Sequence, residues 1–350
     1  MYEKALKENS KIFSVAPMID WTDRHCRFFH RQLTRRALLY TEMIVADAAI
    51  HGDRDKLLGN SQTPSDTSPV ALQLGGSDPL KLSEAAKIGA GYGYQEINLN
   101  VGCPSDRVQS GAFGACLMRD PDLVASCVEA MSKAVDLPVT VKCRIGVDDQ
   151  TPEQVLPDFA KKVWNAGSKA LWVHARKAWL EGLSPKENRN IPPLDYDIVH
   201  VLKRENPQQF IGLNGGVENV IQAKALIENT PALDGAMLGR ASYQSPDILW
   251  DVDALFYDAP TITPDYDALI DAMAEYAQKH VEAGGKLHHV TRHMVGLFGG
   301  KMGSRRWRQI LSVEATKMGA TSQVLKDAYA AVNLTPVAQD VANLAAHISD

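Results

Sequence analysis

The stretch EINLNVGC, residues 96–103, is a near-continuous apolar run that stops at Gly102 and places Cys103 directly before Pro104. Runs of this kind are typical of a parallel strand whose two faces are both buried. A free cysteine is often only a small core residue. The carboxyl end of a strand, however, is also where α/β enzymes carry out their chemistry. The stretch therefore predicts a buried strand and leaves two interpretations of its thiol.

Similar short apolar runs recur along the chain, and amphipathic segments lie between them. One of these segments, residues 120–135, starts with Asp120 as a good N-cap and with Pro121 at the first helical position. Eight such units in roughly 250 residues favour a (β/α)8 TIM barrel. An open doubly wound sheet is the alternative, but its G-x-G-x-x-G signature does not follow the first strand. The predicted strands are residues 13–18, 38–44, 69–76, 96–103, 138–146, 169–176, 210–216 and 235–241.

The pattern changes at DAPTITP, residues 258–264, where two prolines in a short polar stretch indicate a linker. Amphipathic helical segments follow, and no further strand pattern is present. We therefore expect a TIM-barrel catalytic domain at 1–257 and a small all-α helical bundle domain at 265–350. The predicted helices are residues 266–283, 287–298, 304–319, 322–333 and 336–349.

The composition is that of an ordinary soluble protein, with 45% hydrophobic and 23% charged residues among 350. No apolar run approaches the ~20 residues that span a bilayer, and the polar start MYEKALKENSK is no secretory signal. Five cysteines without C-x-x-C spacing argue against a zinc site or a disulfide scaffold. We expect a cytoplasmic monomer with no metal and no membrane partner. The net charge of −5 does not by itself suggest nucleic-acid binding.

Polar residues collect where the apolar strands end, and in a barrel these ends surround one mouth. The seventh and eighth strands end in NGGV and LGRA, whose glycines let a ligand approach the backbone. Barrels often bind phosphate at these two loops, and Arg240 adds a charged donor. Two tight turns without a ligand are the alternative. The candidate phosphate residues are Asn214, Gly215, Gly216, Gly239 and Arg240.

Lys142 and His174 lie in the fifth and sixth predicted strands. A lysine in an apolar strand is costly unless it is paired or liganded. Lys142 could be a Schiff-base lysine, a cation facing an anionic cofactor, or a partner in a salt bridge, for example to Glu42. His174 alone could be a core histidine, but beside Lys142 and the glycine loops we favour a cofactor role.

These residues closely resemble the tRNA-dihydrouridine synthase family of FMN enzymes. The resemblance covers almost the whole barrel and is most specific around Cys103. The segment HARKAWLEGLSPKENRNIPPLDY and the helical C-terminal half are most similar to the A subfamily, which reduces uridines 20 and 20a of the tRNA D-loop. The matching stretches are APMIDWTDRHCRFF, YTEMI, LQLGGSDP, EINLNVGCPSDRVQSGAFGACLMRDP, VTVKCRIGVDD, VHARKAWLEGLSPKENR, IGLNGGV and LGRASYQSP.

The resemblance implies a role for each of these residues. Cys103 donates a proton to C5 of a flipped uridine, and hydride passes from reduced FMN to C6. NADPH, or NADH, is the reductant of the flavin. The flavin ring is contacted by Pro17, Met18, Ile19, Gln73 and Lys142. Its ribityl chain and phosphate are held by His174, Asn214, Gly215, Gly216, Gly239 and Arg240.

The chemistry is consistent with these residue types. Reducing a C5–C6 double bond needs a hydride donor on one face and an acid near C5. No side chain donates hydride, so a redox cofactor is required. A thiol is largely protonated at neutral pH and can supply the proton. Asn98 and Asn100 could align the polar edge of the base.

Two basic segments offer contacts to tRNA phosphates. Residues 286–308 contain six Lys and Arg and no Asp or Glu, and Arg305 and Arg308 are our candidates there. Lys186 and Arg189 lie in a long loop after the sixth strand. Trp307 could stack on a base or simply pack. The alternative for each cation is a solvated surface.

Three other functions remain open at this point. The first is an FMN barrel that acts on a free pyrimidine or dihydroorotate, which would not need the basic helical segment. The second is a flavin-free lyase that uses Lys142 as a Schiff base. The third is a tRNA-binding protein without chemistry, in which Cys103 is only structural.

Overall fold

The computed structural model describes residues 1–59, 68–105 and 113–332 of the chain. Two compact units are present, Met1–Pro264 and Asp265–Asp350, and the boundary between them falls in the proline-containing stretch at 258–264. Asp106 and Arg107, which lie in the matching stretch after Cys103, and the predicted helix at 336–349 are outside the described residues.

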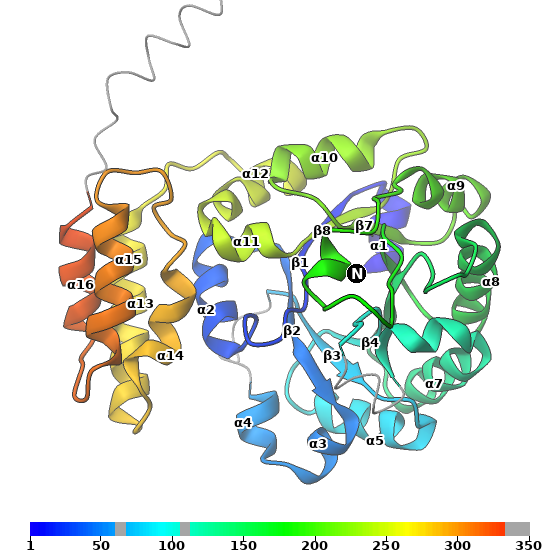
Figure 1. The fold of residues 1–350 in the computed structure, drawn as a ribbon, viewed down its shortest axis with the longest axis horizontal. Coiled ribbons are helices and arrows are strands. Elements are labelled where there is room, and N and C mark those ends of the chain that lie inside the picture. The colour runs from blue at the N-terminus through cyan, green and yellow to red at the C-terminus, as the bar shows by residue number, and fades with distance from the viewer. Residues whose placement is uncertain (60–67, 106–112, 333–350) are drawn as a thin grey trace, which may run out of the picture. The chain divides into compact units, whose positions relative to one another are not determined.

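The first unit is a closed barrel of eight parallel strands with helices around it (Figure 1). Each strand pairs with the next, and β8 returns to β1 with Ile12 opposite Gly235. The TIM-barrel prediction is therefore confirmed, and the doubly wound alternative is wrong. The strands are β1 Ile12–Val15, β2 Leu38–Val45, β3 Val70–Gly75, β4 Glu96–Val101, β5 Val139–Arg144, β6 Leu171–His174, β7 Ile211–Asn214 and β8 Gly235–Leu238.

Helices connect the strands, as the amphipathic segments predict. In α7 the Asp120 carboxylate accepts a hydrogen bond from the Leu123 N–H at 3.0 Å, and Pro121 is the first helical residue. The helices of this unit are α1 Tyr2–Glu8, α2 Arg24–Leu33, α3 Ala46–His51, α4 Arg54–Leu58, α5 Pro79–Ala90, α7 Pro121–Ala134, α8 Pro152–Asn165, α9 Asp197–Glu205, α10 Val220–Glu228, α11 Arg240–Gln244 and α12 Val252–Tyr257, with short 3-10 turns at Gly114–Arg119, Glu187–Arg189 and Pro246–Asp251.

All but one of the strands end earlier than predicted, and β2 runs one residue longer. In β4 the cause is a side chain. The Asn100 Oδ1 atom accepts hydrogen bonds from the backbone N–H groups of Gly102 at 3.1 Å and Cys103 at 3.0 Å. These two N–H groups therefore leave the sheet ladder, and the strand stops at Val101. Cys103 consequently lies in the loop after β4.

The interior of the barrel is more polar than its apolar sequence runs suggest. Side chains alternate between the two faces of a strand, and Glu96, Asn98 and Asn100 share the inward face of β4. All three are buried. Ile97 faces outward, since it lies close to Gly89 of α5. The prediction that both faces of this strand are buried is therefore confirmed, and the structure adds that the inward face of β4 is polar.

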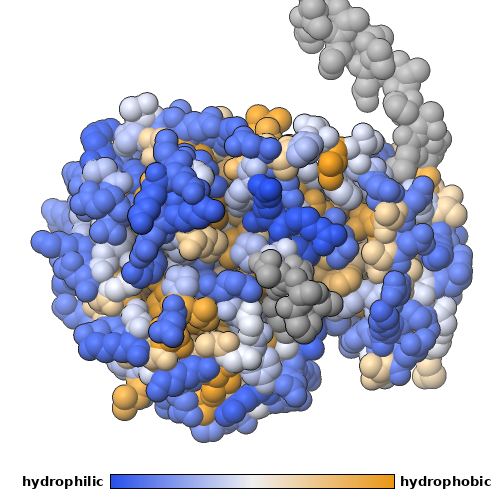
Figure 2. All heavy atoms as spheres, turned by 180° about the vertical axis from the view of Figure 1, so that it is seen from behind, coloured by the Kyte–Doolittle hydropathy of each residue, from blue (hydrophilic) through white to orange (hydrophobic). Residues whose placement is uncertain are grey.

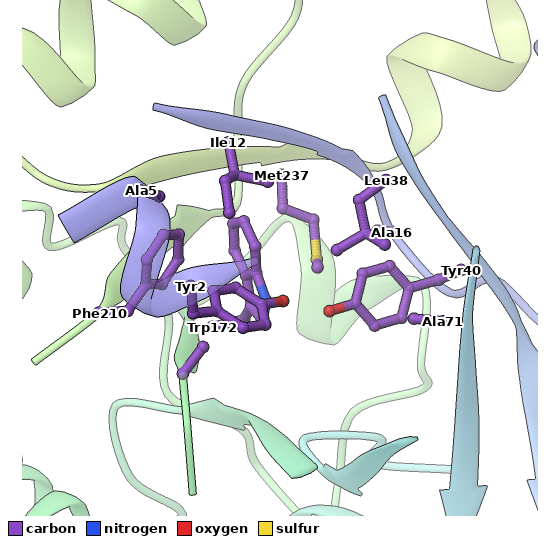
Figure 3. Close-up of a cluster of buried hydrophobic side chains, with 11 residues drawn as sticks. Tyr2, Ala5, Ile12, Ala16, Leu38, Tyr40, Ala71, Trp172, Phe210 and Met237 are labelled. Carbon is purple, nitrogen blue, oxygen red and sulfur yellow. The ribbon is translucent and has the colours of Figure 1, made fainter. Parts of the chain in front are cut away.

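Helix α1 packs against the amino-terminal end of the barrel through Tyr2. The Tyr2 ring packs edge-on against Phe210 with centroids 4.6 Å apart. Figure 3 shows the Tyr2 and Tyr40 hydroxyls pointing into the same space among apolar side chains. The rest of this cluster is Ala5, Ile12, Ala16, Leu38, Ala71, Ala170, Trp172, Phe210 and Met237.

The second unit is helical as far as the structure describes it. Trp307 is fully buried and donates from Nε1 to the Met294 carbonyl at 3.0 Å, so it packs and does not offer a stacking surface. The predicted helix 287–298 is too long. Phe298 adopts φ 66° and packs against Trp307, with centroids 5.0 Å apart, so the chain turns there. The helices are α13 Tyr266–Glu282, α14 Leu287–Thr291, α15 Ser304–Val313 and α16 Gln323–Ala330, with 3-10 turns at Arg292–Met294 and Glu314–Thr316.

The surface is consistent with the hydrophilic composition. On the face seen in Figure 2, hydrophilic residues predominate and hydrophobic residues occur in small groups among them. Within the described ranges, no helix is both long enough and apolar enough to span a bilayer.

Candidate active site

Cys103 is held in a defined loop at the carboxyl end of β4. Its backbone N–H donates to Asn100, and its carbonyl accepts from the Ala115 N–H at 2.9 Å. The thiol is half-buried and lies 3.5 Å from the Ser105 hydroxyl. Both backbone groups of Cys103 are therefore fixed, while its side chain stays accessible from the mouth.

The other four cysteines differ from Cys103. Burial raises the pKa of the Cys127 and Cys143 thiols to about 12, and Cys26 is fully buried. The half-buried Cys116 thiol donates to the Phe113 carbonyl at 3.1 Å, and burial raises its pKa. Cys103 and Cys116 are therefore the two half-buried cysteines, and of these Cys103 lies in the loop directly after β4.

Three buried amides connect β3 to the Cys103 loop. Gln73 donates from Nε2 to Asn98 Oδ1 at 2.8 Å and accepts at Oε1 from Asn100 Nδ2 at 2.8 Å. Asn98 in turn donates from Nδ2 to the Thr140 hydroxyl at 2.7 Å. The predicted site residues Gln73, Asn100 and Cys103 therefore belong to one hydrogen-bonded set.

Lys142 projects from β5 and donates to Asn214 Oδ1 at 3.0 Å. Burial and the nearby Arg144 lower the pKa of the Lys142 amine to about 8. Glu42 is not its partner: the Glu42 carboxylate accepts from the Asp20 N–H. The salt-bridge alternative to Glu42 is therefore wrong, and Lys142 and Asn214 form the pair instead.

His174 lies at the end of β6, beside Asn214 in the sheet register. Burial, followed by the positive charges of Arg144 and Lys142, lowers the pKa of His174 well below its usual value, so the imidazole is neutral. Its buried Nε2 atom has no hydrogen-bond partner among the described residues. A buried polar atom without a partner is costly, which indicates that a ligand completes this site.

The two glycines after β7 fit closely under neighbouring side chains. Gly215 and Gly216 adopt φ 108° and 70°. A Cβ atom on Gly215 would lie 2.6 Å from the His174 ring, and one on Gly216 would lie 2.4 Å from Leu194 Cδ1. A larger residue at either position would have to displace these side chains and adopt a strained φ.

The carboxyl ends of β1 and β8 meet at Gly239. A Cβ atom on Gly239 would lie 3.9 Å from Met18 Sδ. Arg240 lies 3.4 Å from the Arg189 carbonyl, which brings the β8 loop to the long loop after β6. Pro17 is half-buried and Ile19 is exposed. These predicted residues therefore lie around the same mouth.

Arg144 is an organising residue to which the sequence assigned no role. Its Nε donates to the Gly102 carbonyl at 3.1 Å, and its Nη1 donates to the carbonyls of Lys177 at 3.2 Å and Asn188 at 3.0 Å. Arg144 thus ties the Cys103 loop to the loop after β6. The only signal in the sequence is its place two residues after Lys142, on the same strand face.

The mouth carries an excess of positive charge. No ion pair between described residues neutralises Lys142, Arg144, Arg176 or Arg240, and the first three have a pKa lowered by burial. Such a set of unpaired cations is suited to an anionic ligand. With the unpartnered His174 and the two close-fitting glycines, the residues fit a phosphate-bearing cofactor.

The remaining predicted residues are exposed. Lys186 and Arg189 lie in the loop after β6, whose turn is held by the buried Asn188. Arg305 and Arg308 lie on α15 in the second unit. Among the described residues, no group of three or more His, Cys, Asp or Glu side chains is arranged to hold a metal ion.

Fold and site together describe a TIM barrel with a half-buried thiol and several cations at the carboxyl ends of its strands. The dihydrouridine synthase (Dus) family model matches residues 14–333. The chain therefore belongs to the dihydrouridine synthase family.

Several relatives match along nearly their whole length. The chain is 50% identical over 333 residues to a tRNA-dihydrouridine(20/20a) synthase from Shewanella oneidensis, covering 95% of this chain and 97% of that protein. Proteins with the same name from Yersinia pestis and Escherichia coli K12 are 52% and 51% identical, covering 92% and 94% of this chain and 91% and 93% of theirs.

Proposed function

We propose that this enzyme reduces the C5–C6 double bond of uridine in the tRNA D-loop, at positions 20 and 20a, with FMN as cofactor and NADPH as reductant. Family membership and the relatives named tRNA-dihydrouridine(20/20a) synthase support the reaction and the position. The structural observation that carries the proposal is the half-buried Cys103, whose backbone is held at the mouth near buried cations without an ion-pair partner among the described residues.

The residues around the mouth have the chemistry needed to bind FMN. Arg240 and the loop at Gly215 and Gly216 would hold the phosphate and ribityl chain, together with His174, Asn214 and Gly239. Pro17, Met18, Ile19, Gln73 and Lys142 would hold the ring. When bound, the flavin supplies the hydride that no side chain can provide.

The chain's own residues supply the acid and the alignment of the base. The target uridine must leave its stack to reach the mouth. In this proposal Cys103 donates its proton to C5 of the base, because a thiol held at the mouth can act as the general acid for that carbon. Asn100 uses its Oδ1 and one N–H within the protein, so its second N–H is left for a carbonyl of the base.

Both units contribute to substrate binding in this proposal. Residues 1–257 form the FMN-binding catalytic domain, and residues 265–350 form a tRNA-binding helical domain. Lys186, Arg189, Arg305 and Arg308 would contact phosphates, which position an RNA without reading its sequence.

The test is to incubate the purified protein with FMN, NADPH and an unmodified tRNA transcript and to map dihydrouridine by position. Product at 20 and 20a is expected. Product at other D-loop positions would keep the chemistry and overturn the position. If the protein forms no dihydrouridine in tRNA but reacts with free uracil or with dihydroorotate, the proposal is overturned. That result would favour an FMN barrel that acts on small molecules.

A further inference from the structure

A buried carboxylate lies at the centre of the barrel, below the candidate active site. Glu96 is fully buried at the start of β4. Its Oε2 atom accepts from the Tyr2 hydroxyl at 2.5 Å, and its Oε1 atom accepts from the Tyr40 hydroxyl at 2.6 Å. Thr140 also donates to Oε1. Figure 3 shows the two tyrosine hydroxyls facing each other, and both donate to the Glu96 carboxylate.

A line of hydrogen bonds leads from this carboxylate to the backbone of Gly102 and Cys103. Asn98 donates to Thr140, Gln73 donates to Asn98, and Asn100 donates to Gln73, each over 2.7 or 2.8 Å. Asn100 then accepts from the N–H groups of Gly102 and Cys103. Every side chain in the line is buried.

The chemistry of its ends fixes the direction of each bond in the line. At the mouth, backbone N–H groups can only donate, so Asn100 presents its oxygen to them and its NH2 to Gln73. Gln73 accepts from Asn100 and therefore donates its NH2 to the oxygen of Asn98. Asn98 then donates its NH2 to the Thr140 hydroxyl oxygen, and the Thr140 hydroxyl donates its proton to Glu96. At the other end, the Trp172 indole can only donate, and it donates to Tyr2 at 3.3 Å. Tyr2 therefore also directs its proton to Glu96.

All of these donors require one group that only accepts, and an ionised carboxylate is such a group. The O–H···O distances of 2.5 to 2.6 Å are those of charge-assisted bonds. Burial raises the pKa of Glu96, while the three hydroxyls oppose this shift. An apolar side chain would often serve stability equally well at such a place, so stability alone does not account for the carboxylate.

We propose that Glu96 is a positioning residue, which through Thr140, Asn98, Gln73 and Asn100 fixes the loop that presents Cys103 to the substrate. The effect on turnover rests on the function proposed above. The effect on the reactivity of Cys103 does not.

Thr140 offers the sharpest test, because Thr140→Val keeps the shape and removes only the hydroxyl. The N–H of Asn98 then loses its acceptor and the line is broken. We expect kcat to fall between about tenfold and about 100-fold with a smaller change in KM for tRNA, since small misplacements of a reacting group have costs of this size. Thr140→Ser restores the hydroxyl and should stay near the wild type.

A second readout is independent of activity. Iodoacetamide labelling of Cys103 in the purified protein, followed by mass spectrometry of its peptide, should become about fivefold faster in Thr140→Val, because the loop opens more easily when a buried hydrogen bond is lost. Ser14→Ala is the matched control. Ser14 is a buried barrel hydroxyl without a hydrogen-bond partner among the described residues, so labelling should not change.

Glu96→Gln tests the carboxylate itself. The amide NH2 of the glutamine would face the hydroxyls of Tyr2, Tyr40 and Thr140, which donate to Glu96 in the wild type. We expect faster Cys103 labelling and lower kcat than in the wild type. Wild-type labelling and turnover in both Glu96→Gln and Thr140→Val would overturn the proposal. If Glu96→Gln does not fold, the comparison of Thr140→Val with Thr140→Ser still tests the proposal. If the wild type makes no dihydrouridine, the proposed function fails, and the labelling rates still test the positioning role.

Discussion

Cys103 is half-buried in a loop at the carboxyl end of β4, and both of its backbone groups are held by hydrogen bonds. If it is the acid, Cys103→Ala should retain flavin and tRNA binding and lose turnover by about 100-fold or more, the usual range for removing a positioned acid. The measurement is the rate of dihydrouridine formation under saturating tRNA. Cys116→Ala is the matched control, because Cys116 is also half-buried. Normal turnover of Cys103→Ala would end its role as acid.

Lys142 makes stability depend on pH in a direction that can be measured. Its folded pKa of about 8 lies below the ordinary value of 10.5. Between these values the unfolded chain binds more protons, so the free energy of unfolding rises with pH, and below about pH 8 the cost of burying the charge is complete. Lys142→Met removes this cost.

Urea denaturation of the flavin-free protein should therefore show Lys142→Met to be more stable than the wild type near neutral pH, by about 1 kcal/mol or more. Its advantage should shrink as the pH rises from about 8 towards about 10. A difference that is independent of pH would contradict a lowered pKa for Lys142.

The sequence was sufficient to predict which residues surround the mouth. It did not predict the hydrogen bonds that connect them. Lys142, His174 and Asn214 stand out because a polar residue in an apolar strand is unusual. Arg144 is a charged residue in the same strand as Lys142, but its role could not be predicted, because its partners are backbone carbonyls in loops more than 30 residues away in sequence. Strand periodicity gives the face of a side chain, not its partner.

At the scale of elements, the loop after β7 makes a clear prediction. Gly216→Ala should lower flavin retention, because the residue has φ 70° and its Cβ would meet Leu194. The ratio of visible flavin absorbance to protein absorbance in the purified enzyme measures this. Gly93→Ala is the control: Gly93 has a similar φ of 79° and nothing within 4 Å of its Cβ. Equal flavin content in both variants would mean that this loop does not hold the cofactor.

The ends of elements were the least predictable part of the fold. Apolar runs continue past the last ladder bond, so the sequence extends most strands too far. The side chain of Asn100 ends β4 by taking two backbone N–H groups, and Phe298 ends a helical pattern by packing on Trp307. Both are tertiary interactions, which a local pattern does not contain.

For the whole molecule, the order of strands and helices was sufficient to predict the barrel, whereas its polar interior was not expected. Glu96, Asn98 and Asn100 alternate with Ile97, Leu99 and Val101, and a short alternating run is also typical of a half-exposed strand. Only closure of the barrel shows that the polar face points inward, where Glu96 collects its three hydroxyl donors.

The helical unit provides a test of tRNA binding that is separate from the chemistry. Arg305 lies in the first turn of α15, which has no acidic residue, and Arg308 follows one turn later. Cations in the first turn of a helix oppose its dipole, so Glu at position 305 stabilises the helix by about 0.3–1 kcal/mol, while position 308 lies beyond the first turn and is exposed. Lost binding in Arg305→Glu/Arg308→Glu would therefore not be due to unfolding.

We expect the double variant to bind tRNA more weakly and to show a salt dependence whose slope is smaller by about 1 for each lost phosphate contact. Filter binding or fluorescence anisotropy across a salt series measures both quantities. Lys161→Glu/Arg204→Glu, on exposed positions of α8 and α9, makes the same change in net charge and should bind like the wild type. Equal weakening in the two double variants would show that total charge, and not the α15 surface, determines binding.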